Sequence, residues 1–248
     1  MIKLIVSDFD GTLMSFGASS VSAAVKQRLR QALDRGVTVA ISSGRTYEEL
    51  RSYLPDFEKD VYFICCDGAY YVKDGVVLYE KKIAREDLRF FSSQEDTGFP
   101  FILHGAFQNY AVGALRADTA HFRATHLSHV SDVREDVFKV TTFGPVKRLP
   151  PYCGLRTHWD GGPEKMSQYV NRFANKGTAL SDLQMRLILT KYETACIGDS
   201  GNDVAMMKNA KHAICIGDRS PELRAVCNRF ARSPEEALDA LLAENEAR

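Results

Sequence analysis

Short apolar runs alternate with stretches of helical spacing at the start of the chain. The continuous apolar runs Lys3–Ser7, Val37–Ile41 and Val61–Cys65 each predict a strand that is buried on both faces. Between them, apolar residues recur every four positions from about Val21 to Arg35, and a shorter helical pattern runs from about Thr46 to Leu54. Strand, helix, strand, helix and strand in this order predict a parallel sheet with helices on its faces.

The middle of the chain follows a different pattern. Two short apolar runs on either side of Lys73-Asp74-Gly75 predict a hairpin. From about residue 81, proline and glycine interrupt a mixed pattern that predicts one helix and four strands: 85–95, then 101–104, 110–112, 137–143 and 153–159. The parallel pattern then returns, with helices expected over 178–189, 203–209 and 234–243 and strands over 194–197 and 213–216.

These patterns predict an α/β fold, a doubly wound parallel sheet with an inserted α+β cap domain. Residues 1–80 and 172–248 are expected to form the core, and residues 81–171 the inserted domain, with antiparallel strands. Because such a domain would cover the ends of the core strands, we expect it to exclude water and to favour small substrates over proteins.

Composition and charge narrow the possible partners. Thirty-two basic residues balance thirty-two acidic ones, which predicts no general attraction to nucleic acid or to a membrane. No apolar run reaches the roughly 18 residues of a membrane span, and the N-terminus lacks the pattern of a signal peptide. Six cysteines without CxxC spacing argue against disulfides or a zinc site and favour a reducing cytoplasm. We expect a monomer or a small homo-oligomer.

Two acidic clusters follow predicted strands directly. The first is Asp8-Phe9-Asp10-Gly11-Thr12, and the second is Gly198-Asp199-Ser200-Gly201-Asn202-Asp203. The carboxyl ends of parallel strands form the ligand crevice of open α/β sheets, where neighbouring carboxylates repel one another unless a hard cation such as Mg²⁺ is bound. Asp, Gly and Asn are also common turn residues, so one cluster alone has a simpler explanation, whereas both together favour a metal site.

The two clusters belong to a set of four motifs that resembles a known family. Asp8–Thr12 matches the DxDGT signature of the haloacid dehalogenase-like phosphatase superfamily, and Ser42-Ser43-Gly44-Arg45 resembles its second motif. Lys176, at the start of a predicted helix, resembles the third motif, and Gly198–Asp203 resembles the fourth. A large insertion between the second and third motifs is similar to the Cof-type and sucrose-phosphate-phosphatase-like branch.

The chemistry and the resemblance together imply roles for the acidic residues. Asp8 would attack phosphorus and form an aspartyl-phosphate. Asp10 would protonate the leaving alkoxide and later deprotonate the attacking water. Asp199 would bind Mg²⁺ beside Asp8 and the carbonyl oxygen of Asp10, while Asp203 is expected to contact the metal-bound waters or Lys176.

The remaining motif residues are expected to hold the phosphate. Gly11 would let the backbone approach it closely, and Ser43 with the Gly44 amide would donate hydrogen bonds to it. Lys176 would neutralise its charge, and Asn202 would touch phosphate or substrate.

Several assignments have alternatives. Ser42 is a rival for the phosphate contact, and Ser43 would otherwise cap the helix from Thr46. Lys176 could be a solvated charge, and the sequence leaves open whether Arg45 faces the site or pairs on the surface.

Two positions depart from the Cof-type pattern. Asp67, in Cys65-Cys66-Asp67-Gly68-Ala69, stands where that pattern usually has Asn, and Asp218 follows Gly217 in place of the usual Asn. The role of a carboxylate at position 67 stays open. Within the inserted domain, candidates for reading the substrate are Arg116, Arg123, His104 and Trp159, and metal binding by the histidines there is not favoured.

The expected function is that of a Mg²⁺-dependent phosphatase acting on a small phosphorylated metabolite, most simply a sugar or polyol phosphate. Two alternatives remain from the sequence. A phosphomutase would return the phosphoryl group from the aspartate to a sugar. A non-catalytic binding or regulatory protein would have no need of both Asp8 and Asp10.

Overall fold

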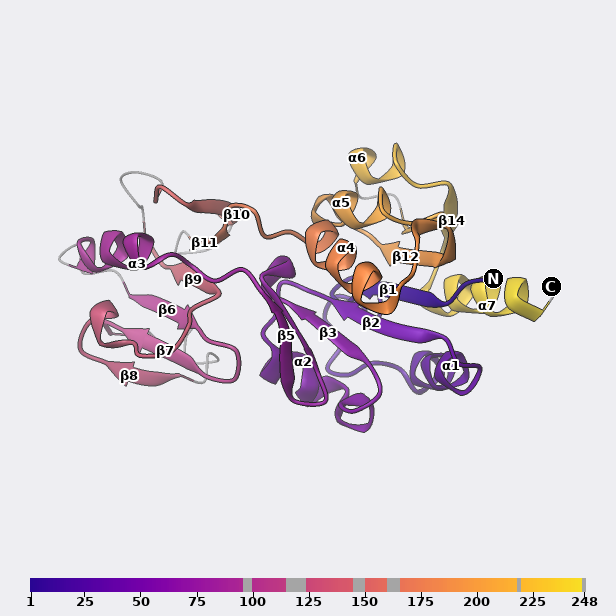
Figure 1. The fold of residues 1–248 in the computed structure, drawn as a ribbon, viewed down its shortest axis with the longest axis horizontal. Helices are drawn as coiled ribbons and strands as arrows, with labels where there is room; N and C mark the ends of the chain where they lie inside the picture. The colour runs from indigo at the N-terminus through magenta and orange to yellow at the C-terminus, as the bar shows by residue number, and fades with distance from the viewer. Residues whose placement is uncertain (96–99, 115–123, 145–149, 160–165, 218–219, 247–248) are drawn as a thin grey trace. The chain divides into compact units, whose positions relative to one another are not determined.

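A computed structural model describes residues 1–248 except 96–99, 115–123, 145–149, 160–165, 218–219 and 247–248. The chain divides into two units: Met1–Tyr79 with Asn175–Arg248, and Glu80–Ala174. Each unit has its own sheet (Figure 1).

The first unit contains an eight-stranded sheet in the order β14-β13-β12-β1-β2-β3-β4-β5. Pairing is parallel from β14 to β3, and β4 runs antiparallel to β3. The strands are β1 (Leu4–Asp8), β2 (Thr38–Ser42), β3 (Tyr62–Cys65), β4 (Tyr70–Lys73), β5 (Val76–Glu80), β12 (Thr194–Gly198), β13 (His212–Ile216) and β14 (Arg229–Ala231). The sheet confirms the doubly wound parallel core, with the expected hairpin forming one edge.

Helices cover both faces of this sheet (Figure 1). On one face, α1 (Ala23–Asp34) packs against α7 (Pro234–Glu246) and β2, and α2 (Tyr47–Tyr53) packs against β3. On the other face, α4 (Lys176–Leu187) packs against α5 (Val204–Met207), which also contacts β12 and β13. The fully buried apolar strand β1 lies between these two layers, as expected for a strand covered on both sides.

Side-chain caps set where the helices begin. The Ser22 hydroxyl accepts a hydrogen bond from the Val25 amide before α1, and Thr46 forms a capping box with Glu49 before α2. The Asn175 side chain accepts from the Thr178 amide, so α4 begins at Lys176, two residues before the expected start. This cap places Lys176 in the first turn of the helix.

Other parts of this unit differ from the expectation. The helix expected over 203–209 is shorter, because a 3₁₀ turn at Gly201–Asp203 precedes α5. The sequence pattern also missed α6 (Pro221–Arg224) and β14. Both are too short for a period to be visible.

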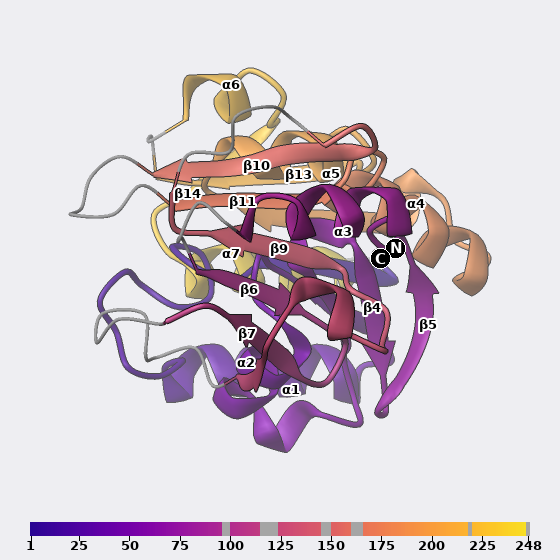
Figure 2. The same ribbon diagram turned by 90° about the vertical axis from the view of Figure 1, so that its left-hand side faces the viewer.

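The second unit contains a six-stranded sheet in the order β10-β11-β9-β6-β7-β8, which Figure 2 shows strand by strand from β10 to β7. Its elements are α3 (Arg85–Ser92), β6 (Phe101–His104), β7 (Asn109–Val112), β8 (Thr125–Leu127), β9 (Lys139–Thr142), β10 (Cys153–Trp159) and β11 (Met166–Asn171). Phe91 of α3 packs in an apolar cluster with Phe101, Leu103, Val140 and Tyr169 on one face of the sheet.

The expectation of antiparallel strands is wrong for one pair in this unit. β7 and β8 are parallel, whereas the other recorded pairs are antiparallel. Parallel neighbours need a long connection between them, and residues 113–124 separate β7 from β8 in the sequence. The sequence pattern also missed β8 and β11, since Ser167 and Gln168 weaken the strand signal.

Among the helices that the structure describes, none combines the length and the apolar character that a membrane crossing requires.

Candidate active site

The site forms where β1 and β12 end beside the first turn of α4. Asp8 is the last residue of β1, Asp199 directly follows β12, and Lys176 opens α4. The Lys176 ammonium donates to Asp8 Oδ1 at 2.5 Å and to Asp203 Oδ1 at 2.7 Å. Lys176, Asp8 and Asp203 are all buried. The lysine is thus held inside the site by two carboxylates and is not a solvated charge.

Burial disfavours both charged forms, so it raises the pKa of a carboxylate and lowers the pKa of an ammonium. Desolvation raises the pKa of Asp8 to about 7, although Lys176 acts to lower it. Burial also disfavours the Lys176 ammonium, but the carboxylates of Asp203 and Asp8 outweigh it and hold the pKa of Lys176 above its ordinary value. The ammonium therefore stays charged. The carboxylates around it can carry more negative charge than this one ammonium balances.

The carboxylates form a set that suits a divalent cation. Oxygens of Asp8, Asp199 and Asp203 all lie within 4.8 Å of one another. Asp8 Oδ2 is buried and accepts no hydrogen bond from the described residues. Lys176 bonds Asp8 and Asp203 only, and Asp199 adds a third buried carboxylate to the group. A hard cation would neutralise this excess charge and supply a partner for Asp8 Oδ2. The site therefore fits Mg²⁺.

Hydrogen bonds orient the oxygens of this cluster. Asp203 Oδ2 accepts from the backbone amides of Asp199 and Ser200, each at 3.1 Å. The Thr12 hydroxyl donates to Asp199 Oδ1 at 3.3 Å. A side chain on Gly198 would collide with the Asp203 carboxylate, so the tight turn after β12 requires glycine.

The side chain of Asp10 lies with Arg45 and not with the other acids. The Arg45 guanidinium donates to both carboxylate oxygens of Asp10 at 2.7 to 3.0 Å. Ser43 Oγ donates to Asp10 Oδ2 at 3.3 Å. This places Arg45 at the site, which the sequence left open. Asp203 was expected to contact metal-bound waters or Lys176. It bonds Lys176 and is also the third carboxylate of the cluster. That the Asp10 carbonyl binds the metal stays a prediction.

The two serines after β2 have different surroundings. Ser43 Oγ accepts from the Arg45 amide at 3.1 Å and faces Asp10, while Thr46 takes the cap of α2. Ser42 Oγ is buried and has no hydrogen-bond partner among the described residues. Ser43 is therefore the serine that lies beside the predicted catalytic acid.

Gly11 lies in the loop after β1 in a conformation that favours glycine. Its φ is +85°, and a Cβ there would collide with the Phe16 ring and with the Asp199 carboxylate. The backbone at Gly11 therefore packs directly against the Asp199 carboxylate, which leaves no room for a side chain at this position.

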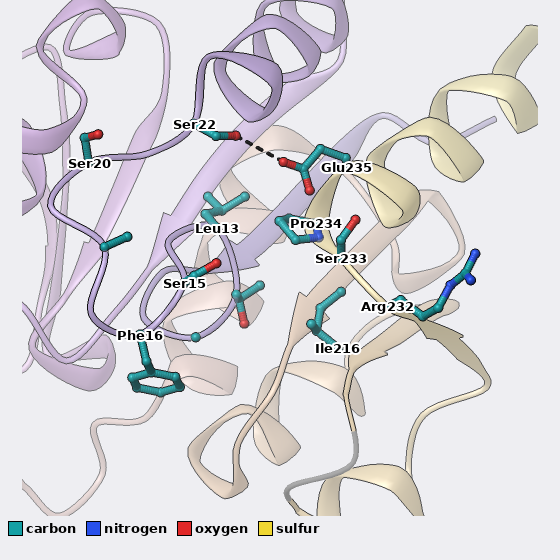
Figure 3. Close-up of a pocket in the computed structure, with 13 residues that line it drawn as sticks. Leu13, Ser15, Phe16, Ser20, Ser22, Ile216, Arg232, Ser233, Pro234 and Glu235 are labelled. Carbon is teal, nitrogen blue, oxygen red and sulfur yellow. Dashed lines mark hydrogen bonds between the residues drawn. The ribbon is translucent and has the colours of Figure 1, made fainter.

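A cavity of about 300 Å³ borders this loop. Residues of the loop line it together with the start of α7, and Figure 3 shows the Ser22 hydroxyl bonded to Glu235 across it. The cavity is hydroxyl-rich and its lining includes Gly11 and Thr12, but none of the clustered carboxylates. Because Thr12 also donates to Asp199, the cavity lies next to the group that could hold a cation.

Asn202 and Asp67 also meet at the site. Asn202 Nδ2 donates to Asp67 Oδ1 at 3.1 Å, although the two residues are far apart in sequence. The sequence placed Asp67 near the edge of the sheet but left its role open, and it gave Thr12, the last residue of the first motif, no role of its own. The sequence signal of Asp67 is its position just after a core strand, and that of Thr12 is its place as the last residue of the first motif.

The candidates for reading the substrate are only partly described. Arg116, Arg123 and the Trp159 side chain lie outside the described residues. His104 is buried, and its ring nitrogens lie 3.0 Å from Asn109 Oδ1 and 2.9 Å from Thr141 Oγ1. Burial, with the Lys139 charge, places its pKa well below its ordinary value, so this imidazole is neutral.

Comparison with known proteins supports one family. The family model of haloacid dehalogenase-like hydrolases matches residues 5–242. Phosphatase YwpJ of Bacillus subtilis is 23% identical over 95% of this chain and 96% of its own length. The HMP-PP phosphatase of Enterobacter sp. is 26% identical over 91% of this chain and 88% of its own. The subclass IIB sugar phosphatase BT4131 shares the fold, with a TM-score of 0.78 and 20% identity over 99% of this chain and 98% of its own.

Proposed function

Because the chain belongs to the haloacid dehalogenase-like hydrolases, as a phosphatase of the Cof type, we propose that it cleaves a small phosphate monoester through an aspartyl-phosphate on Asp8. The observation that carries this proposal is the buried Lys176 held between Asp8 and Asp203, while the second Asp8 oxygen has no hydrogen-bond partner among the described residues.

The first half of the reaction transfers the phosphoryl group to the enzyme. An Asp8 oxygen attacks phosphorus, and the bond from phosphorus to the leaving oxygen breaks. Asp10, two residues further on, gives its proton to that oxygen and releases the alcohol. Lys176 and the Ser43 hydroxyl stabilise the negative charge on the phosphoryl oxygens.

The second half restores the enzyme. Asp10, now a carboxylate, takes a proton from water, and the water oxygen attacks phosphorus. The bond from phosphorus to Asp8 breaks, and inorganic phosphate leaves. Arg45, bonded to both oxygens of Asp10, keeps this carboxylate beside Ser43.

Asp8 and Asp199 would hold Mg²⁺, with the Asp10 carbonyl as the third predicted ligand and Asp203 close by. The ion would supply positive charge that Lys176 alone does not provide against three buried carboxylates.

The proposed substrates are sugar or polyol phosphates. The sugar phosphatase that shares this fold supports this class, and the balanced charge of the chain gives no reason to expect a polymeric anion. All six cysteines are free thiols, which fits the reducing cytoplasm proposed as its location.

The test is phosphate release from a panel of phosphorylated sugars and polyols, with Mg²⁺ or with EDTA. We expect release with Mg²⁺ and a loss of at least about 100-fold after chelation, because the carboxylate charge is then uncompensated. Transfer to a sugar without phosphate release would identify a mutase. Binding of phosphate without any turnover would identify a binding protein, and either result would overturn the proposal.

The two serines offer a matched pair of variants. We expect Ser43→Ala to lower kcat/KM about 10- to 100-fold, because a charge-assisted hydrogen bond to the phosphate is lost. Ser42→Ala should change kcat/KM by less than about threefold, since its hydroxyl has no hydrogen-bond partner among the described residues. The measurement is steady-state phosphate release, and the reverse ranking would assign the contact to Ser42.

A further inference from the structure

The turn after β3 adopts an unusual backbone conformation. Cys66, Asp67 and Gly68 are all left-handed, with φ values of 49°, 55° and 86°. Left-handed residues other than glycine are energetically costly, and they gather at functional sites where the surroundings hold them in place. This backbone conformation therefore indicates a functional role for Cys66 or Asp67.

The neighbouring segments hold this turn in place. The Cys66 amide donates to the Arg45 carbonyl and the Asp67 amide to the Ser43 carbonyl, both at 2.9 Å. On the other side, a Cβ on Gly68 would collide with the carbonyl of Asn175, directly before Lys176. The turn is thus fixed between the serine loop and the start of α4.

This placement brings the Asp67 carboxylate to the predicted phosphate-binding residues. Asp67 is 5% exposed, and its Oδ1 accepts the hydrogen bond from Asn202. A Cβ built on Gly44 would lie 3.3 Å from Asp67 Oδ2. The charge of Asp67 is also one of those that stabilise the Lys176 ammonium, after Asp203 and Asp8.

Asp67 differs in one respect from the other carboxylates around Lys176. Asp8, Asp199 and Asp203 form the group that fits a cation, and Asp67 is not part of it. Its carboxylate faces Gly44 and Asn202, the residues expected to touch phosphate and substrate. A carboxylate there repels a bound anion, whereas an amide of the same shape would not.

We propose that Asp67 is a specificity residue that selects the substrate by charge. It favours phosphate monoesters whose carbon skeleton carries hydroxyl or ammonium groups near the phosphate. It disfavours those with a carboxylate or a second phosphate there, and it weakens the binding of free phosphate, which speeds product release. This inference rests on the proposed function, because it assumes that phosphate binds beside Ser43 and Lys176.

The test compares Asp67→Asn with Asp74→Asn. Asparagine tolerates the left-handed conformation as well as aspartate does, so the change removes the charge and keeps the shape. Asp74 is also left-handed, with φ 49°, but is exposed in the hairpin between β4 and β5. The control therefore makes the same chemical change, in the same backbone conformation, away from the site.

Two measurements are made on the wild type and both variants. The first is the Kd of inorganic phosphate by calorimetry with Mg²⁺ present. The second is kcat/KM for glycerol 3-phosphate, phosphoethanolamine and phosphoglycolate, whose groups near the phosphate are neutral, cationic and anionic. Thermal unfolding shows that each variant is folded.

We expect Asp67→Asn to bind phosphate about five- to tenfold more tightly, and to improve phosphoglycolate relative to the other two substrates by a similar factor. Asp74→Asn should match the wild type. Equal phosphate binding in all three proteins, or binding undetectable in all three, would overturn the role of Asp67, as would an unchanged order of substrates. If no protein releases phosphate from any compound, the proposed function fails, while the phosphate titration still decides whether Asp67 opposes the anion.

Discussion

Replacing Asp8 by Asn is expected to abolish phosphate release, with a loss of at least about 1,000-fold in kcat, because the amide cannot form the aspartyl-phosphate. The change keeps the size and shape of the side chain at the end of β1, so the loss would report on chemistry. The measurement is phosphate release at saturating substrate and Mg²⁺, with Asp74→Asn as the control. Activity within about tenfold of the wild type would exclude Asp8 as the nucleophile.

The same variant also tests the electrostatics of the site. In the metal-free protein, desolvation raises the pKa of Asp8 from 3.8 to about 7, so the folded state disfavours its negative charge. The folded state therefore binds a proton more tightly than the unfolded state does, and the contribution of Asp8 to the free energy of unfolding falls as pH rises from about 4 to about 7. Asp8→Asn should lack this fall.

Urea unfolding with EDTA at several pH values measures this difference between the two proteins. We expect the stability of Asp8→Asn relative to the wild type to increase toward neutral pH, by on the order of 1 kcal/mol or more. Added Mg²⁺ should stabilise the wild type and have little effect on the variant, since one of the carboxylates of the cation site is gone. A constant difference across this pH range would mean that the charge of Asp8 is already compensated without metal.

Much of the fold could be predicted because its main signals are local. Continuous apolar runs such as Lys3–Ser7 and the four-residue spacing of apolar residues from Val21 to Arg35 are visible within a few residues of sequence. The strands of the second unit were harder to predict, because β8 and β11 owe their existence to partners far along the chain. A strand that depends mainly on distant partners has only a weak strand signal in its own sequence.

The site shows the same division between local and distant determinants. Asp8, Lys176 and Asp199 come from motifs at strand ends and a helix start, so their meeting follows from the parallel topology. The partners of Asp10 and Asp67 could not be derived in this way, because they depend on side-chain directions across separate loops. The sequence thus predicted which residues lie together at the site better than it predicted their hydrogen-bond partners.

Replacing Lys176 by Met is expected to cause the largest loss of stability among single changes at the site. The methionine fills a similar volume, but it leaves Asp8 and Asp203 buried without the ammonium that bonds both of them. Removing one partner of a buried ion pair typically costs about 3–5 kcal/mol, because the remaining charge stays desolvated. The free energy of unfolding in urea measures this loss, and Lys191→Met, in an exposed turn, is the matched control.

A second change separates uncompensated charge from lost packing. If the cost of Lys176→Met is electrostatic, adding Asp203→Asn should recover part of the stability, so the double variant would be more stable than the additive sum of the two single changes. Phosphate release should be abolished in Lys176→Met and in the double variant, since the phosphoryl oxygens lose their ammonium partner in each. Additive losses in stability would instead mean that Lys176 acts mainly through packing, and the electrostatic account of the site would then be wrong.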